Sequence, residues 1–401
     1  MTRAPPESLS VCIVAPYDLS TRGGGVKHHI AGLARALRAR GDRVTVLGPA
    51  RAPVGEAGVV TVGGVLSLQS NGSANEMALF ASPFEVASFF RTHAFDVVHV
   101  HEPAIPSLGY WVAWLTPGIP KICTFHAFAD APPLPLRVGQ RFFGALQYPF
   151  FAAGLAVSEA AAEYASRAWK RRLSIVPNGI DTDAFTPPAA SDPGGGLRLL
   201  FVGRLADERK GWRVMLDAYR LLRDRGVDAS LDVVGDTSGA DVPALPGLHA
   251  HGALPRAALI DAYRGCDLFV APSTRQESFG IVLLEAMATG RPIVCSDIRG
   301  YREVAPPAGT TFVPPASASA LADAIASLAP EEARRAAMGG HNRRAVLRYR
   351  WDVVAEEVRE HYLDICSRGE ASARADASRA EASSALPSTK PTSSTGIVWR
   401  P

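Results

Sequence analysis

Short runs of hydrophobic residues alternate with amphipathic stretches along most of the chain. An apolar run at residues 11–15 is followed by glycines, by residues 27–40 with hydrophobic positions at helical spacing, and by a second apolar run at residues 44–47. This order predicts a strand, a helix and a second strand, and such a crossover implies a parallel sheet. Further strands are predicted in this half at residues 96–100, 121–125, 154–157 and 173–176.

The same alternation restarts after a linker-like stretch at residues 192–196. Strands are predicted at residues 197–202, 230–234, 268–271 and 293–295, with helices near residues 211–222 and 255–264. The pattern therefore predicts an α/β protein with two Rossmann-like, doubly wound parallel-sheet domains that face a central cleft. We place the N-terminal domain at residues 1–184 and the C-terminal domain at residues 185–350.

The end of the chain changes in composition. Residues 351–366 have the pattern of one more helix, which we expect to pack back on the N-terminal domain. Residues 367–401 are rich in Ala, Ser and isolated charges and have almost no large apolar side chains. Such a segment buries too little apolar surface to fold, so it is predicted to be disordered.

Composition narrows the class of protein. A chain of 401 residues with 20% charged residues is long enough for two cores, and its net charge of +3 gives no broad basic field, so nucleic acid is not an expected partner. The five cysteines are scattered and odd in number, which is typical of reduced thiols in the cytoplasm. No signal peptide and no apolar run of membrane-spanning length is visible.

Two carboxylates stand eight residues apart, at Glu277 and Glu285. Ser278 is a candidate N-cap for a helix that contains Glu285 about two turns in and that ends at Gly290 and Pro292. The N-terminus of such a helix suits a diphosphate, and the carboxylates suit ribose and sugar hydroxyls. The alternative is an ordinary loop charge followed by the one solvent-facing residue of an apolar helix.

Two basic residues follow the predicted strand at residues 197–202. Arg204 offers a planar fork for phosphate oxygens and Lys210 adds a point charge, so together they suit a leaving diphosphate. A solvated charged loop is the alternative. In the first domain, Gly24 and Gly25 allow the close backbone approach that a phosphate needs.

Histidines also follow the strands of the first half. His99 and His101 alternate on one strand before Glu102, but no third ligand stands at convincing spacing, so no metal site is predicted. His126 ends the strand predicted at residues 121–125. Taken alone, a histidine in such a place is as readily a core residue as a functional one.

The carboxylate spacing, with Ser278, Phe279 and Gly280 between, resembles the Glu-x₇-Glu signature of the retaining glycosyltransferases with the GT-B fold. The resemblance covers most of residues 11–366 and includes residues 203–211 and a predicted hinge turn at residues 178–181. It implies a donor site for a nucleotide-sugar that uses no metal or other cofactor. In that site, Arg204 and Lys210 hold the diphosphate, Glu285 the ribose and Glu277 the sugar, His126 lies beside the reacting centre, and the remaining contacts come from Gly25, Ser278, Phe279 and Gly280.

Within this family the chain is most similar to bacterial phosphatidylinositol mannosyltransferases, through residues 16–17, 24–26, 71–73, 99–103, 106–108, 124–126 and 209–211. This similarity implies transfer of mannose from GDP-mannose, with retained anomeric configuration, to a lipid or polyol phosphate such as phosphatidylinositol. The acceptor-binding residues that it implies are Tyr17, Lys27 and Asn71. The expected location is the cytoplasm, where the protein would act at the inner face of the cytoplasmic membrane.

The acceptor side departs from those enzymes. The arginine expected near Asn71 is absent, and Ala127 and the residues after it lack the hydroxyl and lysine of the lipid enzymes. A UDP-glucose or UDP-N-acetylglucosamine enzyme with another acceptor therefore stays open, as does a non-catalytic nucleotide-sugar-binding protein. A sugar-phosphate epimerase on a related two-domain fold is a further alternative.

A basic and aromatic stretch at residues 136–143, with Trp111 and Trp114 nearby in sequence, suits contact with an anionic membrane. The same stretch equally suits a helix that packs its aromatic side chains into the core.

Overall fold

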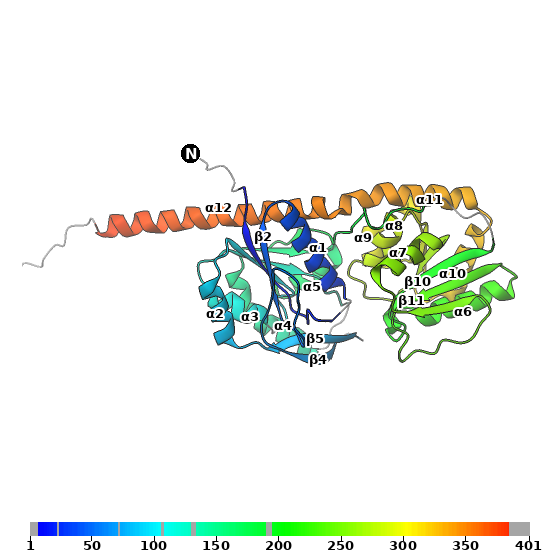
Figure 1. The fold of residues 1–401 in the computed structure, drawn as a ribbon, viewed down its shortest axis with the longest axis horizontal. Coiled ribbons are helices and arrows are strands. Elements are labelled where there is room, and N and C mark those ends of the chain that lie inside the picture. Colours follow the sequence, from blue (N-terminus) through cyan, green and yellow to red (C-terminus); the bar gives the residue numbers. More distant parts are fainter. Residues whose placement is uncertain are drawn as a thin grey trace, which may run out of the picture.

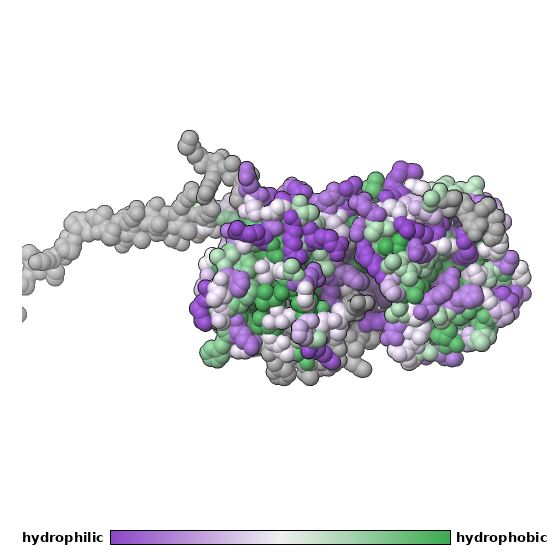
Figure 2. Space-filling model, in the orientation of Figure 1, coloured by the Kyte–Doolittle hydropathy of each residue, from purple (hydrophilic) through white to green (hydrophobic). Residues whose placement is uncertain are grey.

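The computed structural model describes residues 7–21, 24–70, 73–105, 108–129, 134–189 and 195–384. The chain forms two α/β lobes side by side, and its last helix runs across the first lobe and projects beyond it (Figure 1). A hollow separates the two lobes on the face shown in Figure 2.

The N-terminal lobe is built on a seven-stranded parallel sheet of order β3-β2-β1-β6-β7-β8-β9. Its central strands are buried along their whole length, as expected for a sheet with helices on both faces. The strands are β1 (Ser10–Val14), β2 (Arg43–Gly48), β3 (Val59–Thr61), β6 (Val97–His101), β7 (Lys121–Phe125), β8 (Ala153–Ala156) and β9 (Ser174–Ile175). The helices are α1 (Gly25–Ala39), α2 (Pro83–Thr92), α3 (Leu108–Leu115), α4 (Leu134–Gln147), the 3-10 turn η1 (Tyr148–Phe150) and α5 (Glu159–Ser166).

An antiparallel hairpin of β4 (Gly64–Ser70) and β5 (Ser73–Phe80) is added to this lobe. The sequence pattern did not predict it, and Asn71, which comes between the two strands in sequence, lies outside the described residues.

The C-terminal lobe has a six-stranded parallel sheet of order β12-β11-β10-β13-β14-β15. Its strands are β10 (Leu197–Val202), β11 (Ala229–Val234), β12 (Leu248–Gly252), β13 (Leu268–Ala271), β14 (Ile293–Ser296) and β15 (Thr310–Val313). Its helices are α6 (Trp212–Asp224), α7 (Arg256–Gly265), α8 (Ile281–Ala288), α9 (Arg299–Val304), α10 (Ala318–Leu328) and α11 (Glu332–Ala345), with 3-10 turns η2 (Glu208–Lys210), η3 (Pro307–Gly309) and η4 (Val346–Tyr349). The prediction of two parallel-sheet α/β domains is confirmed.

The start of α8 differs from the prediction. Gly280, with φ of 89°, is the N-cap, so Ser278 lies in the loop before the helix and Glu285 lies only about one turn inside it. The cause is steric: a Cβ on Gly280 would lie 2.7 Å from the ring of Tyr301. Only glycine adopts this left-handed conformation at so little cost, so it sets the helix boundary.

The chain crosses between the lobes twice, and the two crossings run side by side. The backbone N–H of Ile180 donates to the carbonyl of Tyr349 at 2.8 Å, and Gly179 abuts the indole of Trp351, where a Cβ would come within 2.4 Å. The turn predicted as a hinge therefore lies against the start of the last helix.

The last helix, α12 (Trp351–Ser384), packs on α1 and shares its core. Val354, Val358 and Tyr362 are buried there, and Arg359 pairs with buried Asp42 at 3.1 Å. The prediction of disorder from residue 367 is wrong for residues 367–384, because alanine-rich sequence extends an existing helix without a new nucleation step. Residues 385–401 lie outside the described part of the chain.

None of the helices that the structure describes has the length and apolar character needed to cross a membrane.

Candidate active site

The polar groups of both lobes gather where the strand order reverses. In the N-terminal lobe β1 lies between β2 and β6, and in the C-terminal lobe β10 lies between β11 and β13. In such sheets the loops after the two diverging strands leave a crevice at the carboxyl edge, which is where ligands bind. The predicted site residues Tyr17, Gly25, Arg204 and Glu277 all lie in or beside the loops that follow β1, β10 and β13.

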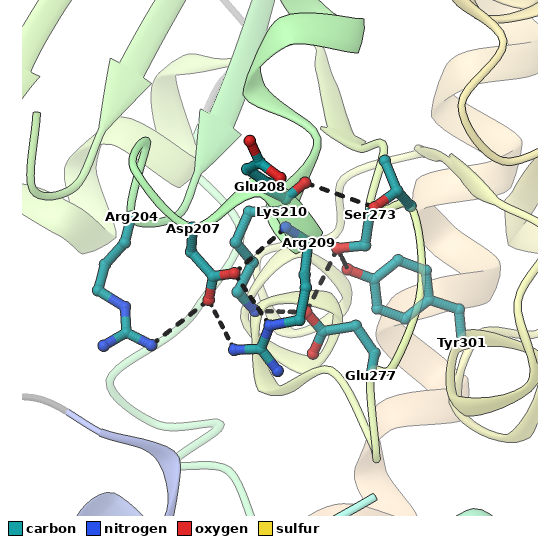
Figure 3. A network of polar contacts seen from close by, with 9 residues as sticks. Arg204, Asp207, Glu208, Arg209, Lys210, Ser273, Glu277 and Tyr301 are labelled. Atoms are coloured by element: carbon teal, nitrogen blue, oxygen red, sulfur yellow. Dashed lines mark hydrogen bonds and ion pairs between the residues drawn. The ribbon is translucent and has the colours of Figure 1, made fainter. Parts of the chain in front are cut away.

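The centre of the C-terminal crevice is an ion pair. The ammonium of Lys210 lies 2.5 Å from Oε1 of Glu277, and the hydroxyl of Ser273 donates to the same oxygen at 3.3 Å (Figure 3). Ser273 in turn lies 2.7 Å from the hydroxyl of Tyr301. Lys210 and Glu277 are only partly exposed, so this pair is screened less than a surface ion pair.

A buried aspartate organises the basic residues beside this pair. Asp207 accepts from Arg209 at 2.7 and 2.9 Å, and Arg204 lies 3.5 Å from the same carboxylate (Figure 3). These hydrogen bonds and the charge of Arg209 hold the pKa of Asp207 below its usual range despite burial. Arg204 stays about half exposed, so its guanidinium is accessible to a ligand anion.

Close backbone contacts hold the two C-terminal loops together. Gly211, with φ of 75°, lies against the carbonyl of Pro272, where a Cβ would come within 2.0 Å. The N–H of Thr274 donates to the carbonyl of Arg209 at 2.8 Å. Gln276, just before Glu277, has φ of 58°, a strained conformation of the kind that clusters at functional sites. Lys210 and Glu277 therefore project from backbones that are fixed against each other.

Glu285 lies at a different part of the same lobe. Its carboxylate accepts a hydrogen bond from the hydroxyl of Tyr263 at 2.7 Å. Burial raises the pKa of Glu285 to about 7, and the bond from Tyr263 and the nearby charge of Arg256 only partly oppose that shift. Glu285 is thus not the solvent-facing charge of an apolar helix.

The predicted site residues that come between Glu277 and Glu285 in sequence lie in different surroundings. Phe279 is buried and packs edge-on against Tyr349, with ring centroids 5.9 Å apart. Ser278 is half-buried in the loop. Phe279 therefore supports the loop from behind, while Gly280 sets the start of α8.

The glycine loop of the N-terminal lobe meets the first turn of α8. A Cβ on Gly25 would lie 3.2 Å from Cδ1 of Ile281, the first residue of that helix. The glycine loop therefore lies beside the N-terminus of α8, and its predicted contact with a phosphate stays a prediction.

His126 is held at the carboxyl end of β7 by a glutamate that the sequence analysis did not single out as a site residue. The backbone N–H of His126 donates to Oε1 of buried Glu102 at 2.6 Å. Burial raises the pKa of Glu102 to about 7, against the hydrogen bonds from the N–H groups of His126 and Ala127. Glu102 has φ of 50°, a strained conformation for a non-glycine residue.

Three buried histidines converge behind this position. His29 from α1, His101 from β6 and His126 have one ring nitrogen each within 4.8 Å of one another. This cluster shares only His101 with the His99 and His101 pair that was weighed from the sequence. Two of the nitrogens are 2.8 Å apart, which is a hydrogen-bond distance and shorter than the roughly 3.3 Å that Zn–N bonds of about 2.0 Å give between tetrahedral ligands. The geometry is that of a hydrogen-bonded cluster.

The predicted acceptor residues fall into three situations. Tyr17 lies near Glu102. Burial raises the pKa of the Tyr17 hydroxyl, and the charge of the Glu102 carboxylate adds a smaller increase. The ammonium of Lys27 donates to Thr21 and to the carbonyl of Asp18, so it organises its own loop. Asn71 lies outside the described residues.

Sequence reasoning missed the partners of the site residues: Asp207, Tyr263, Tyr301, Glu102 and His101. The signal available for Asp207 was its position between Arg204 and Arg209. Tyr263 on α7, Tyr301 on α9 and Glu102 after β6 are brought to the site only by the fold.

Comparisons with known proteins agree with this geometry. Residues 23–184 match the family described as Glycosyltransferase Family 4, and residues 196–330 match Glycosyl transferases group 1. The chain is 33% identical to the phosphatidyl-myo-inositol mannosyltransferase of Mycobacterium leprae (strain TN), over 90% of this chain and 98% of that protein. It is 31% identical to the GDP-mannose-dependent alpha-mannosyltransferase of Mycolicibacterium smegmatis, over 68% of this chain and 74% of that protein.

Among solved structures, Anabaena HepE in complex with UDP-glucose is similar in fold, with a TM-score of 0.69 at 16% identity over 88% of this chain and 99% of that one. The two family models together cover most of both lobes. The chain belongs to the family 4 type of GT-B glycosyltransferases, and it is similar over nearly its full folded length to the phosphatidyl-myo-inositol mannosyltransferases.

Proposed function

We propose that this glycosyltransferase transfers mannose from GDP-mannose to phosphatidylinositol or a related lipid or polyol phosphate, with retention of the anomeric configuration. The observation that supports it most is the pair of Lys210 and Glu277, fixed in one loop network at the C-terminal switch point. The names of the two mannosyltransferase relatives supply the sugar, the donor and the acceptor of this proposal.

The donor is proposed to lie across the C-terminal crevice. Its diphosphate binds Lys210 and Arg204 and faces the N-terminus of α8, whose free N–H groups favour an anion. Glu277 accepts hydrogen bonds from the sugar hydroxyls, and Glu285, held by Tyr263, accepts those of the ribose. Because Gly25 has no side chain, the loop after β1 of the N-terminal lobe can approach the diphosphate from the other side.

The chemistry follows from where charge develops. As the bond from the anomeric carbon to the diphosphate oxygen breaks, negative charge grows on the diphosphate and positive charge on the sugar ring. Lys210 and Arg204 stabilise the departing charge, a role in which one preorganised group is worth roughly 3–4 kcal/mol. We expect no metal to be required, since these cations are already in place. The acceptor hydroxyl oxygen attacks the anomeric carbon on the face that the diphosphate leaves, which retains the configuration, and its proton passes to the departing diphosphate oxygen.

A membrane surface is proposed for acceptor capture. Leu134, Val138 and Phe142 lie one helical turn apart on α4 and are 67%, 58% and 61% exposed, so they do not pack into the core. Arg137 and Arg141 are exposed on the same helix, and the remaining members of this α3–α4 surface are Trp111, Trp114 and Phe150. Exposed apolar and basic side chains in one patch fit an anionic lipid headgroup region. The five cysteines form no disulfide, as is usual in the cytoplasm. Because the donor is also soluble, we infer that the enzyme works at the inner face of the cytoplasmic membrane.

The test is a calorimetric comparison of GDP-mannose, UDP-glucose and UDP-N-acetylglucosamine binding to the purified protein and to Lys210→Ala. Arg225→Ala, which removes an exposed ion pair of the same lobe, is the matched control. Selective binding of GDP-mannose that is lost in Lys210→Ala and kept in Arg225→Ala supports the proposal. Preference for a UDP-sugar, or binding of none of the three, overturns GDP-mannose as the donor.

A further inference from the structure

A chain of buried histidines leads from the proposed active site into the N-terminal lobe. His101, the last residue of β6, places Nδ1 2.8 Å from Nε2 of His126, which follows the neighbouring strand β7. The two rings are 1% and 7% exposed. Behind them, His99 stacks on His101 with ring centroids 4.3 Å apart and bonds to Tyr362 and Thr124, both at 2.7 Å.

Each ring in this pair carries one proton. Burial, reinforced by the neighbouring imidazoles, lowers the pKa of both His101 and His126 well below the usual value, so both are neutral. A neutral imidazole has one N–H and one bare nitrogen. The hydrogen bond between the two rings therefore has two possible directions, and they give His126 opposite tautomers.

The other nitrogen of His101 decides between these directions. Nε2 of His101 is buried and has no hydrogen-bond partner among the described residues. If His101 accepted from His126, its proton would sit on Nε2 as a buried N–H with no acceptor, and orphaned N–H groups of that kind are rare in folded proteins. If His101 donates from Nδ1, only a bare nitrogen is left unpaired there.

The second nitrogen of His126 points to the same answer. Nδ1 of His126 bonds to no residue in the described part of the chain, which leaves it available to a ligand. With His101 as the donor, this Nδ1 carries the proton and offers a hydrogen bond to an oxygen of the sugar or the diphosphate. With the opposite direction it would present a lone pair to an electron-rich donor substrate, which is unfavourable.

We propose that His101 is a positioning residue that donates from Nδ1 to Nε2 of His126, fixing the ring and tautomer of His126 so that its Nδ1–H faces the donor substrate. The inference rests on the proposed function, with His126 beside the transferred sugar as the family resemblance implies, although the tautomer itself does not. Glu102 fixes the backbone of His126 and His101 fixes its ring, so the residue is held twice.

The first test uses the unliganded wild-type protein and needs no activity. Nitrogen-15 NMR of histidine-labelled protein, with His101→Leu to assign the signals, reports which nitrogen of each ring is protonated. The expected result is a protonated Nδ1 on both His101 and His126. A protonated Nε2 on His126 would overturn the proposal, whichever sugar the enzyme transfers.

The second test measures glycosyl transfer by variants. His101→Leu is expected to lower kcat about 10- to 100-fold with little change in the KM for the donor, as for other residues that orient a functional group. His101→Asn, whose amide N–H can replace the Nδ1 donor, is expected to recover most of that loss. His99→Leu is the matched control, since it removes a buried histidine of the same cluster that contacts Tyr362 and Thr124 but makes no hydrogen bond to His126. Equal losses in His99→Leu and His101→Leu, or no recovery in His101→Asn, would contradict a positioning role.

Discussion

The ammonium of Lys210 and the carboxylate of Glu277 lie 2.5 Å apart although 67 residues separate them in sequence. They come from the loops after β10 and β13, the two strands that diverge at the C-terminal switch point. The proposed diphosphate site and sugar site are therefore one electrostatic unit. When a donor binds both residues, its phosphate pairs with the lysine and its hydroxyls donate to the glutamate. Two protein–donor interactions then replace one partly buried ion pair.

Replacing either residue should strongly reduce transfer without unfolding the protein. Lys210→Ala and Glu277→Ala are each expected to lower kcat by roughly 10²–10³-fold, because each removes a charge that acts on the transition state. Steady-state kinetics check this, with circular dichroism for the fold. Arg225→Ala should stay close to wild type, and full activity in either site variant would refute the assignment.

Donor affinity should depend on pH through Glu285. Its pKa is raised to about 7 by burial, so it is protonated below that pH and charged above it. The charged form accepts hydrogen bonds from ribose more strongly, so donor affinity should rise as pH increases from 6 to 8. Calorimetry at several pH values measures this, and Glu285→Gln should flatten the profile. A wild-type profile that slopes the other way would be incompatible with this role.

Two glycines that flank α6 provide a matched pair for testing the loop network. Gly211 and Gly226 have φ of 75° and 72°, but a Cβ on Gly211 would lie 2.0 Å from the carbonyl of Pro272 whereas Gly226 has open space. Gly226→Ala should cost only the roughly 1–2 kcal/mol of a left-handed alanine. Gly211→Ala should lower the thermal midpoint further and weaken donor binding, because it separates the loops of Lys210 and Glu277. Equal effects of both substitutions would show that the close approach is unimportant.

The α3–α4 surface should mediate membrane binding. Phe142→Ser is expected to weaken binding to vesicles containing anionic phospholipid by about tenfold, the scale of losing one inserted aromatic side chain. Phe84→Ser on α2 removes a more exposed phenylalanine, at 83%, from a different helix and serves as the control. Vesicle flotation measures both. Equal losses in the two variants, or no dependence on anionic lipid, would rule out this surface.

The regular core of the fold was predictable from sequence. Strands such as Lys121–Phe125, Leu197–Val202 and Leu268–Ala271 are short, mainly apolar runs of the kind found in parallel sheets, and their predicted bounds match the structure. The hairpin of β4 and β5 and the continuation of α12 were not predicted. Their sequences lack a clear apolar period, so local propensity and tertiary placement decide them.

Some residues of the candidate site were also predictable from sequence, and others were not. Arg204, Lys210, Glu277 and Glu285 stand at recognisable spacing, so the sequence indicated them, although their roles stay predictions. Partners such as Tyr263 for Glu285 and His101 for His126 were not predicted, because their pairing is set by how strands and helices pack rather than by separation along the chain.

The most direct test of the proposed function is the product of the reaction itself. Purified protein is incubated with GDP-mannose and vesicles containing phosphatidylinositol, and the lipids are analysed by mass spectrometry, with Lys210→Ala alongside. We predict a phosphatidylinositol species that carries one added hexose in the wild type and none in the variant. No glycosylated lipid from GDP-mannose, with a hexosylated product formed instead from UDP-glucose, would contradict the account.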